Sequence, residues 1–301
     1  MKLVKKIIIV IFSLLMAYKV LLFPNRPFKR KNIFTFWEPI KQIPGYISLC
    51  IKTWKKFLPE YQINILDYKK AKSFIGEPLF SNIICNNLSI MHNSDAIRVA
   101  LLKKYGGIWI DADTILLNDK IIKNFRKFEL SMIWEEEKKF HYIALIYTKK
   151  NSFIMSEWQN KIINKIAEFK NFLSNETNFL EFNKIHKNFT KYDFLGNSII
   201  DPIINEGKHK NFFHINRNIT KVFPELFYIR NDSMTHKEKY ILFYFQKRNP
   251  QIILNYSKSI IFLHNNWMPK KYKNMTEIEF LKKDILISQI FRKILNLTKN
   301  Q

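Results

Sequence analysis

The sequence predicts an α/β fold with a mixed central sheet that helices cover on both faces. Short apolar runs alternate with helical patterns through the first 120 residues, and this alternation is typical of such a sheet. The 301 residues are 47% hydrophobic, so the chain is long and apolar enough to bury a large core. Only six glycines are present and aromatic residues reach 15%, which excludes a low-complexity or collagen-like chain.

Hydrophobic periodicity and helix-breaking residues define the predicted elements. Strands are short apolar runs such as IFTFW, and one helix carries Ile47, Ile51 and Trp54 at helical spacing. Ser94 is an expected N-cap, and Gly106 with Gly107 ends the helix that Ser94 begins. The predicted strands are 33–37, 61–67, 108–110, 131–135, 142–148 and 259–264. The predicted helices are 44–57, 69–75, 94–105, 152–170, 196–206 and a basic amphipathic helix over 276–296.

Three of these strands have a side chain suited to ligand binding at their carboxyl end. Trp37, Asp67 and Asp111 each stand at the carboxyl end of a predicted strand. Ligands of open α/β sheets bind beyond the carboxyl ends of the strands. The sequence therefore predicts a binding site at this edge of the sheet.

The chain is strongly basic, with a formal net charge of +25. Only eight of the fifty basic residues are arginine, the residue that reads bases and phosphates best. The lysines run evenly along the chain, so we expect no nucleic-acid partner and favour a membrane with anionic lipid. Cys50 and Cys85 lack C-x-x-C spacing, so the sequence encodes neither a cysteine zinc site nor a disulfide framework.

An apolar run from Ile7 to Phe23, broken only by Lys19, follows three lysines at the amino terminus. A helix of this length reaches about 26 Å, just short of a typical hydrocarbon core. No A-x-A cleavage site follows, so the sequence predicts an uncleaved, single-pass membrane anchor, with a short buried helix as the alternative. Basic residues flank both ends of the run, which leaves the orientation of the anchor open.

Asp111 and Asp113 form a D-x-D pair directly after an apolar strand. Two carboxylates one residue apart can bind a hard divalent cation and leave positions for water and phosphate. A solvated turn is the plain alternative. Haloacid-dehalogenase-type phosphohydrolases begin similarly, with Asp111 as nucleophile and Asp113 as acid/base, but only EEE at 135–137 and scattered single acids follow. A non-catalytic membrane or carbohydrate-binding protein with this fold is a third alternative.

The stretch SDAIRVALLKKYGGIWIDADTILL, residues 94–117, combines four features in a fixed order. They are Ser94-Asp95-x-x-Arg98, Tyr105-Gly106-Gly107, the apolar strand 108–110 and Asp111-Ala112-Asp113. This compound pattern resembles the signature of glycosyltransferases with a D-x-D sugar-binding region. That group holds capsular polysaccharide synthesis proteins, yeast-type initiating α-mannosyltransferases and clostridial glucosylating toxins. The segments IFTFWEP, FLGNSIIDPII and IFLHNNW extend the resemblance along the chain.

The resemblance implies a GT-A-type nucleotide-sugar-binding fold and a hexosyltransferase. The donor would be a UDP- or GDP-sugar, and the acceptor a glycan or a lipid-linked glycan in surface polysaccharide or glycoconjugate synthesis. Transfer would retain the anomeric configuration, and Mn²⁺ or Mg²⁺ is the expected cofactor. The expected organisation is an anchor and basic linker over 1–31, a nucleotide-sugar-binding region over 32–150, and an acceptor-side helical region with the closing strand and final helix over 151–301.

The resemblance also implies roles for the residues of the compound pattern. Asp95 and Arg98 lie on one helix face, at i and i+3, and would bind hydroxyls of the donor sugar; an intrahelical ion pair is the plain alternative. Asp113 would ligate the metal directly, and Asp111 would help to hold the ribose and a metal-bound water. The metal would neutralise the diphosphate and stabilise the departing nucleotide.

Two further segments complete the expected site. Trp37 occupies the place where similar enzymes stack an aromatic ring on the nucleobase, although it could equally be a core residue. In HNNW, residues 264–267, His264 or Asn266 would supply a further metal or phosphate ligand. Trp267 would lie near the glycosidic oxygen.

Overall fold

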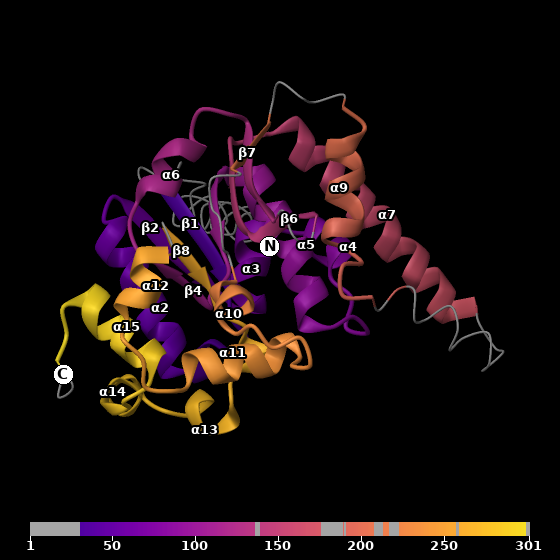
Figure 1. The fold of residues 1–301 in the computed structure, drawn as a ribbon. Helices are drawn as coiled ribbons and strands as arrows, with labels where there is room; N and C mark the ends of the chain where they lie inside the picture. Colours follow the sequence, from indigo (N-terminus) through magenta and orange to yellow (C-terminus); the bar gives the residue numbers. More distant parts are fainter. Residues whose placement is uncertain are drawn as a thin grey trace, which may run out of the picture. The chain divides into compact units, whose positions relative to one another are not determined.

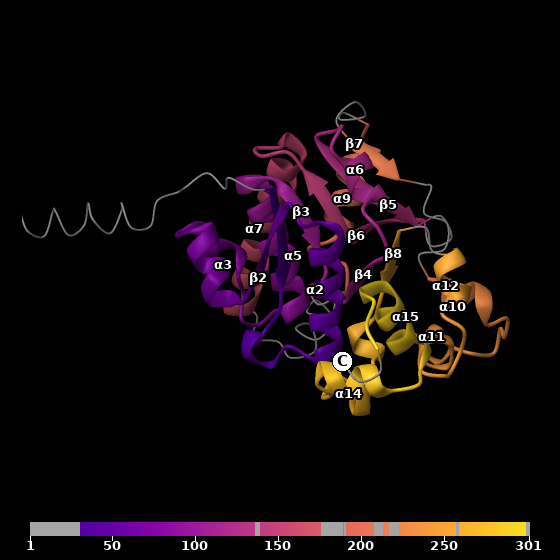
Figure 2. The ribbon, with the colours of Figure 1, turned by 90° about the vertical axis from the view of Figure 1, so that its left-hand side faces the viewer.

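The computed structural model describes residues 31–135, 139–175, 189, 191–207, 213–216, 223–256 and 259–298. The described residues from Asn32 onward belong to one compact unit. Figures 1 and 2 show the helices and strands from two directions at right angles. The predicted α/β architecture with a mixed central sheet is confirmed.

The described strands of the central sheet have the order β2-β1-β3-β6-β5-β7. β1 is parallel to β3 and β5 is parallel to β7, whereas β6 is antiparallel to both β3 and β5. β4 and β8 form a separate antiparallel pair. The bounds are β1 (Lys31–Phe36), β2 (Tyr61–Leu66), β3 (Gly107–Ile110), β4 (Thr114–Leu116), β5 (Leu130–Glu135), β6 (Phe140–Thr148), β7 (Phe213–Asn216) and β8 (Ile260–Phe262).

Two groups of helices pack around these strands. In the first, α5 contacts α3, α4 and α7, and α7 contacts α9; in the second, α2 contacts β4, α14 and α15. In Figure 2, α3 lies at the left of the strands, and α15 and α11 lie below β5 and β8. The α-helices are α2 (Gly45–Phe57), α3 (Tyr68–Ile75), α4 (Leu79–Ile83), α5 (Ile90–Tyr105), α6 (Lys120–Phe125), α7 (Phe153–Asn175), α9 (Asn197–Asn205), α10 (Pro224–Tyr228), α11 (His236–Tyr244), α12 (Gln251–Tyr256), α13 (Lys270–Lys273), α14 (Glu277–Lys282) and α15 (Leu286–Leu295). The 3₁₀ turns are η1 (Ile40–Gln42) and η2 (Asn265–Trp267).

The helix before the D-x-D pair has its N-cap five residues earlier than predicted. Its N-cap is Ser89, whose side chain accepts a hydrogen bond from the backbone N–H of His92, so Ser94 lies inside the helix. Its carboxyl end agrees with the prediction, because Gly106 is the C-cap at φ +66° and Gly107 follows at φ +104°. A Cβ on Gly107 would lie 2.6 Å from the carbonyl oxygen of Asn32, so only glycine lets β3 begin beside β1.

The helix predicted over 276–296 is instead two helices, α14 and α15. Thr276 caps α14 in a capping box with Glu279, and the backbone turns extended at Lys283 before α15 begins. Apolar residues on both helices are buried in the core, Phe280 and Phe291 among them. The apolar periodicity was therefore real, but it belongs to two packed helices.

The predicted membrane localisation is corrected by the structure. No helix in the described ranges has both the length and the apolar character needed to cross a bilayer. The expected anchor, Ile7 to Phe23, falls within residues 1–30 and lies outside the described residues.

The pair β4 and β8 brings a late segment of the chain to the D-x-D pair. Thr114 lies opposite Phe262, and the N–H of Leu263 donates to the carbonyl oxygen of Asp113 at 2.9 Å. α2 supports β4 from the core, since the indole N–H of Trp54 donates to the carbonyl oxygen of Thr114 at 2.7 Å. The segment after β8 is therefore fixed beside the end of β3, about 150 residues away in sequence.

Candidate functional site

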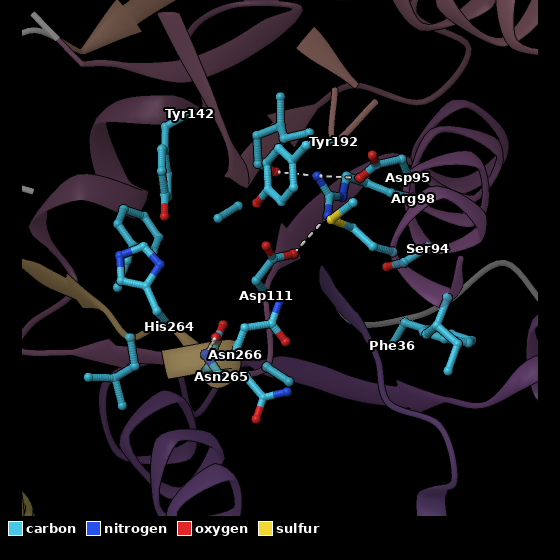
Figure 3. Close-up of a pocket in the computed structure, with 18 of the residues that line it drawn as sticks. Phe36, Ser94, Asp95, Arg98, Asp111, Tyr142, Tyr192, His264, Asn265 and Asn266 are labelled. Carbon is cyan, nitrogen blue, oxygen red and sulfur yellow. Dashed lines mark hydrogen bonds and ion pairs between the residues drawn. The ribbon is translucent and has the colours of Figure 1, made fainter. Parts of the chain in front are cut away.

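One cavity of about 700 Å³ opens at the carboxyl ends of β1 and β3. Its walls come from the ends of these strands, the first half of α5, β6, the segment before α9 and the turn after β8. Figure 3 shows Asp95, Arg98 and Asp111 next to one another, with His264 on the other side of the cavity. Every site residue predicted from the sequence lines this cavity: Trp37, Asp95, Arg98, Asp111, Asp113, His264, Asn266 and Trp267.

Arg98 connects the two acidic parts of the cavity. Its guanidinium lies 3.3 Å from Asp95 Oδ1 and 2.9 Å from Asp111 Oδ1, and it donates to the carbonyl oxygen of Ile143 at 2.9 Å. Arg98 and Asp95 are each only 4% exposed. The expected i, i+3 pair of Asp95 and Arg98 is therefore present and is buried. It differs from an isolated surface pair on one helix, because Arg98 also contacts the end of β3 and a carbonyl oxygen of β6.

Trp109 fixes the carboxylate of Asp111. The indole N–H donates to Asp111 Oδ1 at 2.6 Å, and the Arg98 guanidinium lies 4.9 Å from the indole ring centre. Asp111 Oδ1 thus has two partners from the protein, and these hold the carboxyl group at the end of β3. Trp109 itself is fully buried in the strand. The sequence signal for this role was an indole N–H inside an apolar strand, which requires a partner.

Asp113 is held from the opposite side of the cavity. Its Oδ2 accepts a hydrogen bond from the backbone N–H of Asn265 at 2.9 Å. Asp113 is half-buried and so differs from the fully exposed strand-end acid that a solvated turn would place there. Figure 3 places Asn265 and Asn266 below Asp111 in the view, on the floor of the cavity.

Two of these carboxyl groups have strongly raised pKa values. Burial raises the pKa of Asp113 to about 7, and the neighbouring charge of Asp111 adds to the effect. Burial also raises the pKa of Asp95 to about 7, with Arg98 opposing the shift and Asp111 contributing to it. Acidic groups crowded away from water gain stability from a bound cation, and such groups concentrate at functional sites.

The end of the HNNW segment forms an aromatic cluster. The ring of His264 stacks on Phe223 with centroids 5.1 Å apart and lies 4.0 Å from the ring of Trp267. The ring of Tyr240 packs against the rings of His264 and Trp267. His264 is therefore part of a packed wall, whereas Asn266 offers a carboxamide on the cavity floor.

Several cavity residues did not follow from the sequence. Tyr142 lines the cavity from β6, Tyr192 from the segment before α9, and Asn197 from the first position of α9. FLGNSIIDPII, which resembles a family segment, was the available signal for Asn197. Nothing in the sequence singled out Tyr192, whose pKa is raised to about 12 by desolvation at the cavity and by the nearby charges of Asp111 and Asp95.

The described residues include no group of three or more His, Cys, Asp or Glu side chains that could hold a metal ion. Asp111 and Asp113 together supply carboxylate oxygens, and Asn266 adds an amide oxygen at the same cavity. This donor set suits a cation that takes one or two carboxylates and completes its shell with phosphate and water.

Comparison with known proteins gives a family and several relatives. A family model described as capsular polysaccharide synthesis protein matches residues 16–257, well over half of the chain. The O-glycosyltransferase braB of Annulohypoxylon truncatum is 25% identical over 174 residues, covering 51% of this chain and 40% of the relative. The glycosyltransferase afumC of Aspergillus fumigatus is 25% identical over 98 residues, covering 29% of this chain and 25% of the relative. The chain thus spans less than half the length of these curated relatives.

Comparison with solved structures gives matches whose titles name glycosyltransferases. The PaToxG glycosyltransferase has a TM-score of 0.39 at 17% identity, with 98% of this chain and 96% of that chain covered. The UDP-bound glycosyltransferase domain of the YGT toxin has a TM-score of 0.45 at 9% identity, with 90% and 100% covered.

Proposed function

The chain belongs to the capsular polysaccharide synthesis protein family, and on that premise we propose that it is a glycosyltransferase that uses a nucleotide sugar. The observation that carries the proposal is the convergence of Asp95, Arg98, Asp111 and Asp113 on one cavity at the carboxyl ends of β1 and β3. The glycosyltransferase titles of the curated relatives support the same reaction class. We assign nucleotide-sugar binding to residues 32–150 in a GT-A-type fold and the acceptor side to residues 151–301.

The diphosphate of the donor would lie at the D-x-D pair. Asp111 Oδ1 already accepts from Arg98 and Trp109, and Asp113 Oδ2 accepts from Asn265, so the second oxygen of each carboxylate is the one offered to a cation. Asp113 and Asp111 would hold Mn²⁺ or Mg²⁺, with Asn266 or His264 as a further ligand. The bound ion would supply Lewis-acid stabilisation of the departing nucleoside diphosphate.

The donor hexose would lie against Asp95 and Arg98. A carboxylate and a guanidinium present acceptors and donors in fixed directions, which suits the hydroxyls of a sugar ring. Arg98 is held by three partners, so its N–H groups do not have to be ordered when the sugar binds. This pair would thus orient the anomeric carbon for attack by an acceptor hydroxyl.

Transfer breaks the bond between the anomeric carbon and the diphosphate oxygen and forms a bond to the acceptor oxygen. We propose retention of configuration on the basis of the family resemblance. No pair of cavity carboxylates stands out as nucleophile and acid in the manner of a retaining hydrolase. The acceptor would be a glycan or a glycolipid headgroup that enters between the segment before α9 and the turn after β8.

The test is nucleotide release from a panel of UDP- and GDP-sugars by the full chain with manganese. We expect at least one sugar nucleotide to be turned over, and Asp113→Asn to abolish that turnover while the circular dichroism spectrum stays unchanged. Asp119→Asn is the matched control, because Asp119 pairs with Lys123 outside the cavity. If no sugar nucleotide is hydrolysed or transferred, or if Asp113→Asn retains the wild-type rate, the proposal is wrong.

A further inference from the structure

Among the carboxylates that line the cavity, Glu38 and Asp193 have no role in the proposed reaction, and Glu38 is the one fixed beside the strand ends. Glu38 follows Trp37 directly after β1, lines the cavity and is half-buried. Its Oε2 accepts a hydrogen bond from the backbone N–H of Tyr68 at 3.0 Å. Tyr68 is the first residue of α3, so this bond fixes the carboxylate beside the end of β2.

The position of Glu38 is far from the place assigned to the diphosphate. The strand order β2-β1-β3 puts the end of β2 on one side of β1 and the end of β3, with Asp111, on the other. Neighbouring strands lie about 4.8 Å apart, so the Glu38 carboxylate is roughly two strand spacings from the D-x-D pair. A nucleoside diphosphate carries its negative charge at one end and a neutral base at the other. An acid at the β2 side of the cavity can therefore face the base without repelling the phosphates.

The residues around Glu38 suit a base. Phe36 and Trp37 line the same part of the cavity, and aromatic rings are the usual platform on which bases stack. The backbone is well fixed there, because the N–H of Trp37 donates to the carbonyl oxygen of Leu66 at 2.9 Å. Glu38 thus presents its carboxylate from a rigid corner, next to a stacking surface.

The hydrogen-bonding edge of a base determines how it meets a carboxylate, which only accepts hydrogen bonds. Guanine presents two adjacent donors on its Watson–Crick edge, the ring N1–H and the exocyclic amine. Uracil presents a single N–H between two carbonyl oxygens, and those oxygens would face the carboxylate oxygens unfavourably. A buried or half-buried acceptor pair therefore discriminates strongly between the two bases.

We propose, on the premise that the cavity binds a nucleotide sugar, that Glu38 reads guanine and that the donor is a GDP-linked sugar. Both carboxylate oxygens take part. Oε2 keeps its bond to Tyr68, since a carboxylate oxygen accepts more than one hydrogen bond, and the two guanine donors occupy the outward lone pairs. The specificity of the donor site is thus set by a residue outside the D-x-D pair.

Calorimetric titration of the full chain with GDP, IDP and UDP, each with manganese, tests this assignment. GDP should bind about ten- to a hundredfold more tightly than UDP, the range that charge-assisted hydrogen bonds give. IDP lacks only the exocyclic amine and should bind more weakly than GDP. In Glu38→Gln the amide offers one acceptor and one donor. The preference for GDP over IDP should therefore disappear, and the affinity for UDP should rise.

The variant keeps an oxygen for the N–H of Tyr68, and Asp67 still caps α3, so the fold should not change. Glu60→Gln is the matched control, because Glu60 is exposed and pairs with Arg126 outside the cavity. Equal or tighter binding of UDP by the wild type overturns the guanine assignment and leaves the glycosyltransferase proposal standing. If Glu38→Gln still binds GDP more tightly than IDP, the guanine assignment is likewise overturned and the glycosyltransferase proposal stands. Failure of all three nucleotides to bind overturns both proposals.

Discussion

Replacement of Arg98 by methionine is the most direct test of the buried charge network. The guanidinium contacts Asp95, Asp111 and the carbonyl oxygen of Ile143, and the residue is 4% exposed. Methionine fills a similar volume but leaves Asp95 buried without a counter-charge. Loss of one partner from a buried pair costs about 3–5 kcal/mol of folding free energy.

The structure places the expected loss near the lower end of that range. Burial already raises the pKa of Asp95 to about 7 with Arg98 present, so in the variant Asp95 takes up a proton and the loss of the ion pair is limited. We expect the free energy of unfolding to fall by about 3 kcal/mol in urea titrations at neutral pH. Asp95→Asn combined with Arg98→Met should restore at least about 1 kcal/mol, because the uncompensated acid is removed.

Arg126→Met is the matched control for this measurement. Arg126 pairs with Glu60 at 3.2 Å and lies over the ring of Tyr61, but it is 30% exposed and outside the cavity. Its loss should cost about 1 kcal/mol or less. If Arg98→Met is no less stable than Arg126→Met, the network does not hold the site together and the reasoning fails.

Three further predictions concern the turn, the helix start and the D-x-D pair. Gly107→Ala should lower the free energy of unfolding by about 2 kcal/mol or more, because the residue has φ +104° and its Cβ would meet backbone; urea titration measures this, and a smaller loss would mean that β3 can move. Ser89→Ala should cost about 1 kcal/mol and Ser94→Ala almost nothing, since only Ser89 caps the helix; the reverse order would contradict this helix boundary. Asp111→Asn keeps an oxygen for Arg98 and Trp109, so the thermal midpoint should change little. Manganese-dependent nucleotide binding by calorimetry should nevertheless fall at least tenfold, and unaltered binding would exclude Asp111 from the site.

Local sequence patterns were enough to find the D-x-D region, because its signals act over a few residues. Gly106 and Gly107 mark a turn that no other residue can make, and the apolar strand 108–110 must end where two acids follow. The i, i+3 spacing of Asp95 and Arg98 places them on one helix face whatever the rest of the chain does. These features are therefore visible without a structure.

Features that depend on packing were misplaced or missed. The cap at Ser89 competes with Ser94 as a helix start, and only the contacts of the first turn decide between them. The break between α14 and α15 interrupts a periodic apolar pattern without a glycine or proline to announce it. The role of Trp109 depends on where its indole N–H points, which the sequence leaves open.

The sequence by itself determined that the chain is basic, rich in aromatic residues and of the α/β class. It also determined that Asp111 and Asp113 follow an apolar strand and that the preceding helix carries Asp95 and Arg98. Only the tertiary structure decided that Trp37, Asp113 and Asn266 share a cavity. Pairing of β4 with β8 joins segments about 150 residues apart, and no local pattern specifies which distant strand completes a pair. The sequence specifies the acidic residues, whereas the fold buries Asp95 and Asp113 together and so raises their pKa values.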